Sequence, residues 1–327
     1  MKKIDILNMS LQEKQSLALT VIKRDDPFLV SNPHNNKPVI LTHVPRTAGV
    51  TMDAILLGVA HYFKRSWVRL PGDAYSQYWG NPKPNILGSV TELKEQLNDA
   101  YLISGHMPFG LHQKLALDPI YITVLRDPIE RAWSQIRRIA RDDGELSDPK
   151  ILELINNGGV IDNLQVRMIS GCLDKNEKCD EKMLEQAKYN LLNYYALVGL
   201  VDNFNVFLTS LLSGLGWPDL MFRTRNISEK LKEDPSLIVH RSLTNQNEYD
   251  SVLVEYAKNI VLKKSSKFIS ERDSRGEFKQ LQVEDTLFSL DPFTLGDNSI
   301  GVLGHDHFCS LEKELLGAGV NLSKVQM

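Results

Sequence analysis

Cysteine is scarce in this chain, and no stretch of it has the character of a membrane or export segment. Its 327 residues include 3 cysteines, an odd number that argues against a disulfide framework. No window approaches the roughly 18 consecutive apolar residues of a membrane span. The N-terminal run MKKIDILNMSLQEKQ interrupts any apolar signal core with acids and amides. We therefore expect a protein of the cytoplasm without a membrane span.

The sequence also lacks an excess of positive charge and a set of cysteines and histidines spaced to bind a metal. The formal net charge is -3, whereas proteins that bind nucleic acids usually carry a strongly basic face. Cys172 and Cys179 are too far apart for half of a zinc knuckle, and His305 and His307 lie far along the chain. The sequence thus predicts no nucleic-acid partner and no metal site. It leaves the oligomeric state open.

Short β-rich runs alternate with amphipathic runs through most of the chain. Strands are predicted over 37–44, 101–106, 120–126 and 195–201, and helices over 51–63, 130–143, 181–193 and 203–217. This alternation predicts an α/β fold, a P-loop-like parallel sheet flanked by helices, with a C-terminal appendage. We expect a helical or irregular leader over 1–36, one domain over 37–265, and the appendage over 266–327, packed on that domain.

The first motif, HVPRTAGVT, spans 43–51 between a buried strand and a helix. Such a turn directs backbone N–H groups and the positive end of a helix dipole at one point, which favours a phosphate-like anion. It is not a Walker A loop, because Val50 stands where the lysine would be and the cation, Arg46, comes earlier. An ordinary strand-to-helix turn would look similar. The candidate anion-binding residues are Arg46, Thr47, Ala48, Gly49, Val50 and Thr51.

The second motif, LRDPIERAWS, spans 125–134. Arg126 ends a predicted strand, so its guanidinium is expected at the carboxyl edge of the sheet, where open α/β folds bind ligands. Asp127 and Pro128 suit the cap and first turn of a helix, and Ser134 within that helix offers a hydroxyl to the same anion. The further arginines have an alternative interpretation as surface charges: Arg131, Arg137, Arg138 and Arg141.

The third motif, SGHMPFGLH, spans 104–112 at the end of another predicted strand. His106 would face the same edge as the other two loops, and a neutral imidazole is a suitable base near neutral pH. A lone histidine is more often structural. The convergence of three loops on one crevice favours a catalytic role for His106.

These stretches resemble the sulfotransferases that use 3′-phosphoadenosine 5′-phosphosulfate (PAPS). The likeness is greatest to their carbohydrate branch, which includes the heparan sulfate sulfotransferases and bacterial relatives. THVPRTAGVT resembles the family's 5′-phosphosulfate loop, VLRDPIERAWS its 3′-phosphate motif, and SGHMPFGLH the segment that supplies its catalytic histidine. DNLQVRMISG, 162–171, and runs as far as residue 265 are similar to the bacterial members, in matching order.

The resemblance implies an enzyme that transfers a sulfuryl group from PAPS, as co-substrate, to a hydroxyl of a carbohydrate or glycoconjugate without a metal. It implies that His106 is the base, that Arg46 and its loop stabilise the leaving 5′-phosphate, and that Arg126 and Ser134 bind the 3′-phosphate. Weaker candidates for nucleotide contacts lie near a later loop: Arg223, Arg225 and Asn226.

Two departures from the family pattern leave other functions open. The family's loop lysine is Arg46 here, and Val50 replaces a hydroxyl residue, which removes a contact worth about 1 kcal/mol. One alternative is a degenerate P-loop kinase or nucleotide-binding protein, although we find no Walker lysine with an acidic metal ligand. The other is a PAPS-binding homologue with weakened catalysis, which the change to Arg46 favours.

Overall fold

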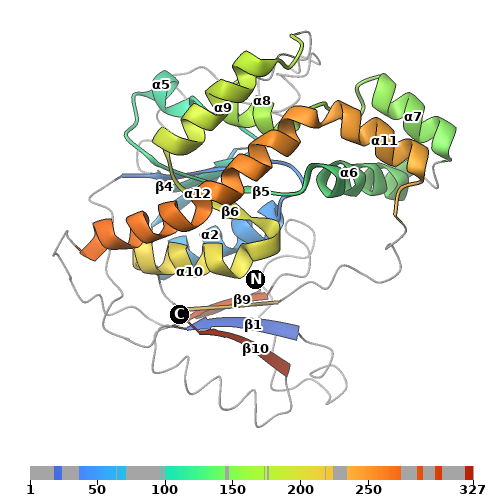
Figure 1. Ribbon diagram of the computed structural model, residues 1–327. Coiled ribbons are helices and arrows are strands. Elements are labelled where there is room, and N and C mark those ends of the chain that lie inside the picture. The colour runs from blue at the N-terminus through green and yellow to red at the C-terminus, as the bar shows by residue number, and fades with distance from the viewer. Residues whose placement is uncertain are drawn as a thin grey trace.

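A five-stranded parallel sheet forms the centre of the computed structural model (Figure 1). Its order is β3-β4-β2-β5-β6, with β2 in the middle. The strands are β2 (Val39–Thr42), β3 (Ser66–Arg69), β4 (Ala100–Gly105), β5 (Ile120–Leu125) and β6 (Tyr195–Leu200). Every residue of β2 and β4 is buried, as expected of parallel strands covered on both faces. The predicted α/β fold class is confirmed.

The structure describes most of the sheet and its helices, and shorter pieces elsewhere. The described residues are 18–23, 37–63, 65–70, 97, 100–143, 147–172, 174, 177–217, 219–223, 234–273, 286–289, 299–303 and 321–326. No helix within these ranges combines the length and the apolar character that crossing a membrane requires.

Helices cover both faces of the sheet. On one face α2 (Gly49–Tyr62) and α10 (Phe204–Leu215) pack against apolar side chains such as Leu41 and Ile122. On the other face lie α8 (Leu164–Ser170), α9 (Glu181–Asn193) and the long α12 (Glu248–Asp273), which bury Ile40 and Val198. Figure 1 shows these two layers above and below the strands.

The connections that leave β2 and β5 diverge. After β2 the chain passes through α2 on one face and reaches β3, whereas after β5 it passes through α8 and α9 on the other face and reaches β6. Because β2 and β5 are neighbours, their carboxyl ends form the topological switch point at which open α/β sheets bind ligands. The motifs over 43–51 and 125–134 both begin at this point.

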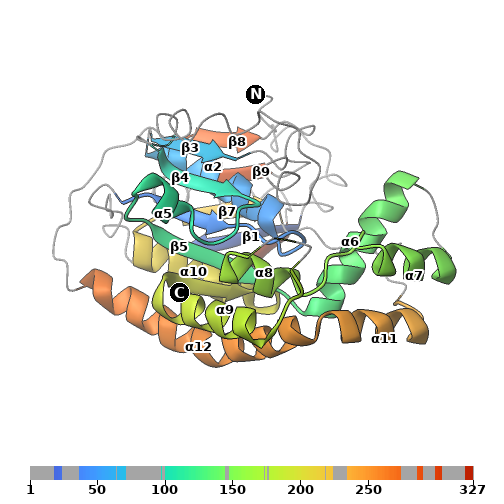
Figure 2. The same cartoon turned by 90° about the horizontal axis from the view of Figure 1, so that it is seen from above.

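Three helices extend from the end of the molecule nearest the switch point. Helices α6 (Pro128–Asp143), α7 (Asp148–Asn156) and α11 (Leu237–Gln246) project together to one side in both views (Figures 1 and 2). They share a separate apolar core, formed by Ala132, Ile136, Ile151, Ile155, Val160, Val239 and Leu243. The shorter elements are α5 (Leu111–Leu115) and the 3-10 turn η3 (Val201–Asn203).

A second sheet joins segments from both ends of the chain. Its order is β10 (Asn321–Gln326), β1 (Ala18–Lys23), β7 (Asp219–Arg223), β9 (Ser299–Leu303) and β8 (Thr286–Ser289). β1 runs parallel to β10 and antiparallel to β7, and β9 lies against α2. The leader, expected to be helical or irregular, therefore contributes a strand. The division at residues 36 and 265 remains a prediction, and α12 runs through the second of these positions.

Candidate functional site

The turn after β2 has a strained backbone. Arg46 and Ala48 both have positive φ angles, 72° and 64°, which is a conformation that costs residues other than glycine about 1 to 3 kcal/mol. The buried Thr47 between them donates its hydroxyl to the carbonyl of Val44 at 2.8 Å. Such strain persists only where the surroundings enforce it, and it is common in loops that bind ligands.

The turn leads directly into the N-terminus of α2. Ala48 is the last residue before the helix, and its carbonyl accepts the first helical bond, from Met52 N at 3.1 Å. The N–H groups of Gly49, Val50 and Thr51 precede that bond and have no acceptor within the helix. They lie at the positive end of the helix dipole. The candidate loop residues therefore offer backbone donors at the switch point, as the sequence predicts.

The close approach of His43 requires glycine at position 49. A Cβ atom at Gly49 would lie 1.5 Å from His43 Nε2, so no other residue fits unless the imidazole moves. His43 is 5% exposed and lies under the loop. This burial places His43 in the support of the site.

Arg126 follows the last residue of β5 and lies against the first turn. Its NH1 donates to the carbonyl of Arg46 at 3.3 Å, and its Nε and NH2 donate to Glu130 Oε2 at 3.2 and 3.0 Å. These bonds use three of the five guanidinium N–H groups. Two remain for a ligand, as far as the described residues are concerned. The side chain is only 12% exposed, so a bound anion would be largely shielded from water.

The helix after Arg126 begins as the sequence predicts. Asp127 accepts a bond from Glu130 N at 2.9 Å through Oδ1, which is the bond of an N-cap, and Pro128 occupies the first helical position. Ser134 lies within the same helix, is 6% exposed, and accepts from Arg46 Nε at 3.0 Å. Arg46, Arg126 and Ser134 thus come together at one point, although they belong to two separate motifs.

His106 lies beside this cluster at the end of β4. Thr42 of β2 pairs with Gly105 of β4, so His43 and His106 leave the sheet side by side, with their ring centroids 4.3 Å apart. His106 Nδ1 lies 2.9 Å from the carbonyl of His43. Because a carbonyl only accepts, Nδ1 carries the hydrogen and Nε2 is the basic nitrogen of the neutral ring.

Burial lowers the pKa of His106, and the bond to the His43 carbonyl and the nearby Asp53 carboxylate oppose this shift. The ring is therefore neutral near pH 7, which is the form that can take up a proton. Burial also lowers the pKa of His43, and the neighbouring His106 adds to that shift. Two neutral imidazoles consequently lie in contact at this edge of the sheet.

A buried carboxylate, which the sequence analysis missed, supports the two histidines. Asp53 is fully buried in α2, binds Arg69 Nε at 2.8 Å through Oδ2, and lies 3.7 Å from His43 Nδ1. Burial raises the pKa of Asp53, while bonds from Ser104 and Arg69 lower it. The acid and the arginine are in different elements, so no local pattern in the sequence marks them as partners.

The other histidine of the third motif lies elsewhere. His112 Nδ1 is 3.1 Å from the hydroxyl of Tyr121, near the amino end of β5, and its ring packs against Phe109 and Tyr194. That is the edge of the sheet opposite to His106. This position excludes His112 from the cluster around His106.

The other residues singled out in the sequence include a buried arginine and several that lie wholly or partly outside the described part of the structure. Arg131, weighed as a surface charge, is 1% exposed, and its charge acts on the buried Asp250. Arg225 and Asn226 lie outside the described residues, as does the side chain of Arg223. Val50 is described in its backbone only, within α2. Among the described side chains, no group of three His, Cys, Asp or Glu residues is placed to hold a metal ion.

Comparison with known proteins adds little to this picture. No protein-family model matches the chain, and no curated protein matches it significantly. Among solved structures, the chain is similar to a sulfotransferase from Alicyclobacillus acidocaldarius, with a TM-score of 0.33 and 14% identity. The match covers 72% of this chain and 96% of the other. A likeness of this size supports no argument, so the function must come from the site.

Proposed function

We propose that this protein is a sulfotransferase that moves a sulfuryl group from PAPS to a hydroxyl of a carbohydrate or glycoconjugate. One observation carries the proposal: two arginines, a buried serine hydroxyl and a helix N-terminus meet at the switch point, with a neutral histidine beside them. The cations and N–H groups suit a ligand with two separate anionic groups. The histidine supplies the base that attack by a hydroxyl requires.

In the proposed reaction the acceptor oxygen attacks sulfur in line with the bond to the 5′-phosphate. His106 Nε2 takes the hydroxyl proton, a new bond forms between the acceptor oxygen and sulfur, and the bond from sulfur to the bridging oxygen breaks. The electron pair of that bond stays with the leaving adenosine 3′,5′-bisphosphate. The bond from Nδ1 to the His43 carbonyl supports this role, because it fixes the tautomer and the ring orientation.

Arg46 and the first amides of α2 would stabilise the charge that develops on the leaving 5′-phosphate. The strained backbone at Arg46 and Ala48 favours this role, because it holds the donors in place before the ligand arrives. Arginine in place of the family's lysine keeps the charge and adds a fork that can bind two oxygens. Such donors can offset the hydroxyl contact that Val50 lacks.

Arg126 and Ser134 would bind the 3′-phosphate, the group that distinguishes PAPS from ATP. Ser134 accepts from Arg46 and has no acceptor for its own hydroxyl hydrogen among the described residues, so it can donate to a phosphate oxygen. Arg126 keeps two N–H groups for the same anion. The direct contact between Arg46 and Ser134 supports adjacent subsites for the two anionic groups of one ligand.

The decisive experiment supplies the protein with PAPS radiolabelled in the sulfuryl group, together with an extract containing glycoconjugates. We expect a labelled product and free adenosine 3′,5′-bisphosphate, in equal amounts and with or without a chelator. A matched reaction with ATP labelled in its γ-phosphate and Mg²⁺ tests for a kinase. Phosphoryl transfer there, with no sulfuryl transfer, would overturn the proposal. Tight binding of PAPS without turnover on any acceptor would identify a non-catalytic homologue.

A further inference from the structure

Gln165 holds the backbone of Arg126 from both sides. Its Oε1 accepts from Arg126 N at 3.0 Å, and its Nε2 donates to the carbonyl of Arg126 at 2.9 Å. Gln165 is fully buried in α8. It belongs to the run DNLQVRMISG, 162–171, to which the proposed function assigns no role. The pair of bonds fixes the peptide groups on each side of Arg126 at the point where β5 ends.

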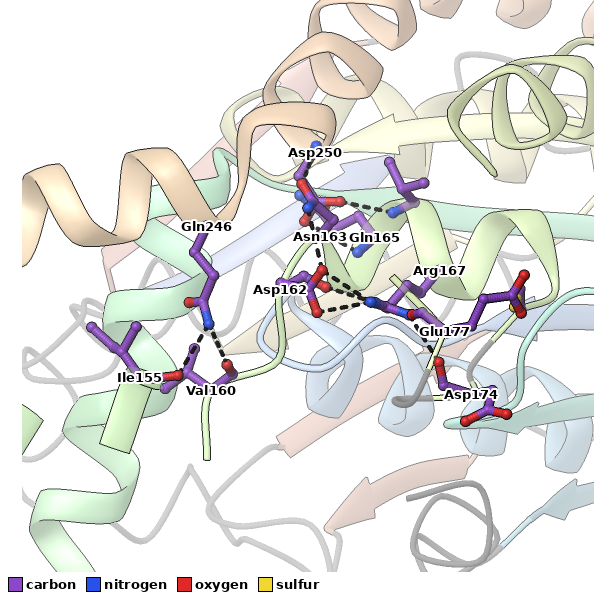
Figure 3. Close-up of polar contacts among 12 residues, drawn as sticks. Ile155, Val160, Asp162, Asn163, Gln165, Arg167, Asp174, Glu177, Gln246 and Asp250 are labelled. Carbon is purple, nitrogen blue, oxygen red and sulfur yellow. Dashed lines mark hydrogen bonds and ion pairs between the residues drawn. The ribbon is translucent and has the colours of Figure 1, made fainter. Parts of the chain in front are cut away.

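Asp250, at the start of α12, fixes Gln165 in turn (Figure 3). Its carboxylate accepts from Gln165 N at 3.1 Å and from Val166 N at 2.7 Å, and its own N–H donates to Asn163 Oδ1 at 3.1 Å. Asp250 thereby caps the N-terminus of α8, where Asn163 makes no side-chain cap of its own. The carboxylate is fully buried, so both of its oxygens depend on these N–H donors and on nearby positive charge.

The far end of α8 is also fixed. The buried guanidinium of Arg167 donates to both carboxylate oxygens of Asp162, at 2.9 and 3.0 Å, and to the carbonyls of Asp174 and Glu177, at 3.0 and 2.9 Å. Figure 3 shows this cluster next to Gln165 and Asp250. Asp250 therefore fixes the start of α8, Arg167 ties its last turn to the chain before and after the helix, and the Gln165 amide faces Arg126 in one orientation.

We propose that Gln165 and Asp250 are positioning residues that set the guanidinium of Arg126 and thereby determine selectivity for a ligand with a 3′-phosphate. The inference rests on the proposed function. Neither residue would touch the nucleotide, since both are fully buried, Gln165 against the backbone of Arg126 and Asp250 against Gln165. Their effect depends on geometry: a rotation of the Arg126 peptide groups moves a long side chain whose binding requires alignment within a fraction of an ångström.

The test compares dissociation constants for adenosine 3′,5′-bisphosphate and adenosine 5′-phosphate, measured by calorimetry on the full chain. Gln165→Met keeps the volume and removes both bonds to Arg126. We expect it to reduce the selectivity for the bisphosphate by roughly tenfold, as loss of one aligned, charge-assisted contact between Arg126 and the 3′-phosphate would, with little change for the monophosphate. Asp250→Asn should lower selectivity less, because one amide oxygen still accepts. The selectivity measured for Arg126→Ala gives the value expected when the contact between Arg126 and the 3′-phosphate is lost completely.

Gln246 provides a matched control. It is another inward-facing amide that binds backbone carbonyls, those of Ile155 at 3.3 Å and Val160 at 2.9 Å, but in the helices that project from the sheet (Figure 3). Gln246→Met makes the same chemical change and should lower the melting temperature without altering selectivity. If Gln165→Met also lowers only the melting temperature, Gln165 is merely structural and the inference is wrong.

Amide hydrogen exchange separates this inference from the proposed function. Wild-type protein that binds both nucleotides equally, or neither, contradicts the proposed function. The Arg126 amide still reports on Gln165 in that case, because its hydrogen is bound to Gln165 Oε1 in the wild type. Faster exchange at Arg126 in Gln165→Met than in Gln246→Met supports the positioning role. Equal exchange in the two variants contradicts it.

Discussion

The turn after β2 and the turn after β5 both lead from a buried parallel strand into a helix, yet their backbones differ. In the first, Arg46 and Ala48 have positive φ angles, and the N–H groups that open α2 have no acceptor within the helix. In the second, Asp127 caps α6 and Pro128 opens it, while Gln165 pairs with the backbone of Arg126.

Because of this difference, the two turns would bind the anionic groups of the proposed ligand by different means. Ala48, the residue before α2, has no side-chain acceptor, so a ligand at the N-terminus of α2 would take the place of a cap. At the start of α6 the cap already occupies Glu130 N and Pro128 has no N–H, so the second turn offers fewer backbone donors and would contribute mainly the side chains of Arg126 and Ser134. We therefore expect ligand affinity to depend partly on backbone conformation at the first turn and mainly on side chains at the second.

The largest effect is expected at His106, whose role neither turn can replace. His106→Ala should lower turnover by about 10² to 10⁴, the usual contribution of a positioned base, with nearly unchanged affinity for PAPS. The wild-type rate should fall as pH drops, because protonation removes the base. Burial lowers the pKa of His106, so this acidic limb should lie below the ordinary histidine value of about 6.5.

The acidic limb should be absent in the His106→Ala variant. His112→Ala is the matched control, since His112 lies at the opposite edge of the sheet, and it should affect stability more than rate. A normal rate in His106→Ala, or a large loss of PAPS affinity, would show that the base is another group.

Arg46 tests whether the first turn also needs its side chain. Arg46→Ala should lower turnover by about 10² to 10³, as loss of one donor to a developing anion does. Arg46→Lys should stay within about tenfold of the wild type, because both cations reach the leaving oxygen. Steady-state rates with PAPS check both, with Arg138→Ala, an exposed arginine on α6, as control. If alanine serves as well as lysine, the turn acts through its backbone alone.

Glu130 tests competition in the second turn. Its carboxylate is 59% exposed and binds the Arg126 guanidinium, so an incoming phosphate must share or displace it. Glu130→Gln should raise the affinity for adenosine 3′,5′-bisphosphate by about two- to fivefold, in keeping with an exposed ion pair worth about 0 to 1 kcal/mol. Glu255→Gln changes a similar exposed pair on α12 and should have no effect. Weaker binding in Glu130→Gln would mean that Glu130 orients Arg126 rather than competing for it.

The smallest effect is expected from relief of strain in the first turn. Ala48→Gly should raise the free energy of unfolding by about 1 kcal/mol, since glycine adopts a positive φ without a steric penalty. Affinity for PAPS should fall by about twofold, because the turn becomes less fixed before binding. Ala116, with a φ of 52°, is the matched position outside the site. Ala116→Gly should alter stability alone, and chemical denaturation with calorimetry measures both quantities.

The strands, the caps and the motifs were accessible from the sequence because local patterns specify them. Buried runs of apolar residues predict β2, β4, β5 and β6, and the pair Asp127 and Pro128 predicts the start of α6 within the helix that contains Ser134. The expectation that strand ends share one edge of a parallel sheet then brought Arg46, His106 and Arg126 together. The short strand β3, with two of its four residues exposed, gave no such signal.

What surrounds these residues was decided by tertiary structure. Gln165 and Asp250 are 85 positions apart, and Arg69 reaches Asp53 from a different element, so no periodicity links either pair. The strand β1 pairs with β10 from the opposite end of the chain, which a scan of neighbouring residues does not detect. Such contacts depend on strand order and on which helix covers which face. Hydrophobic periodicity identifies the buried face of an element but does not specify its partner.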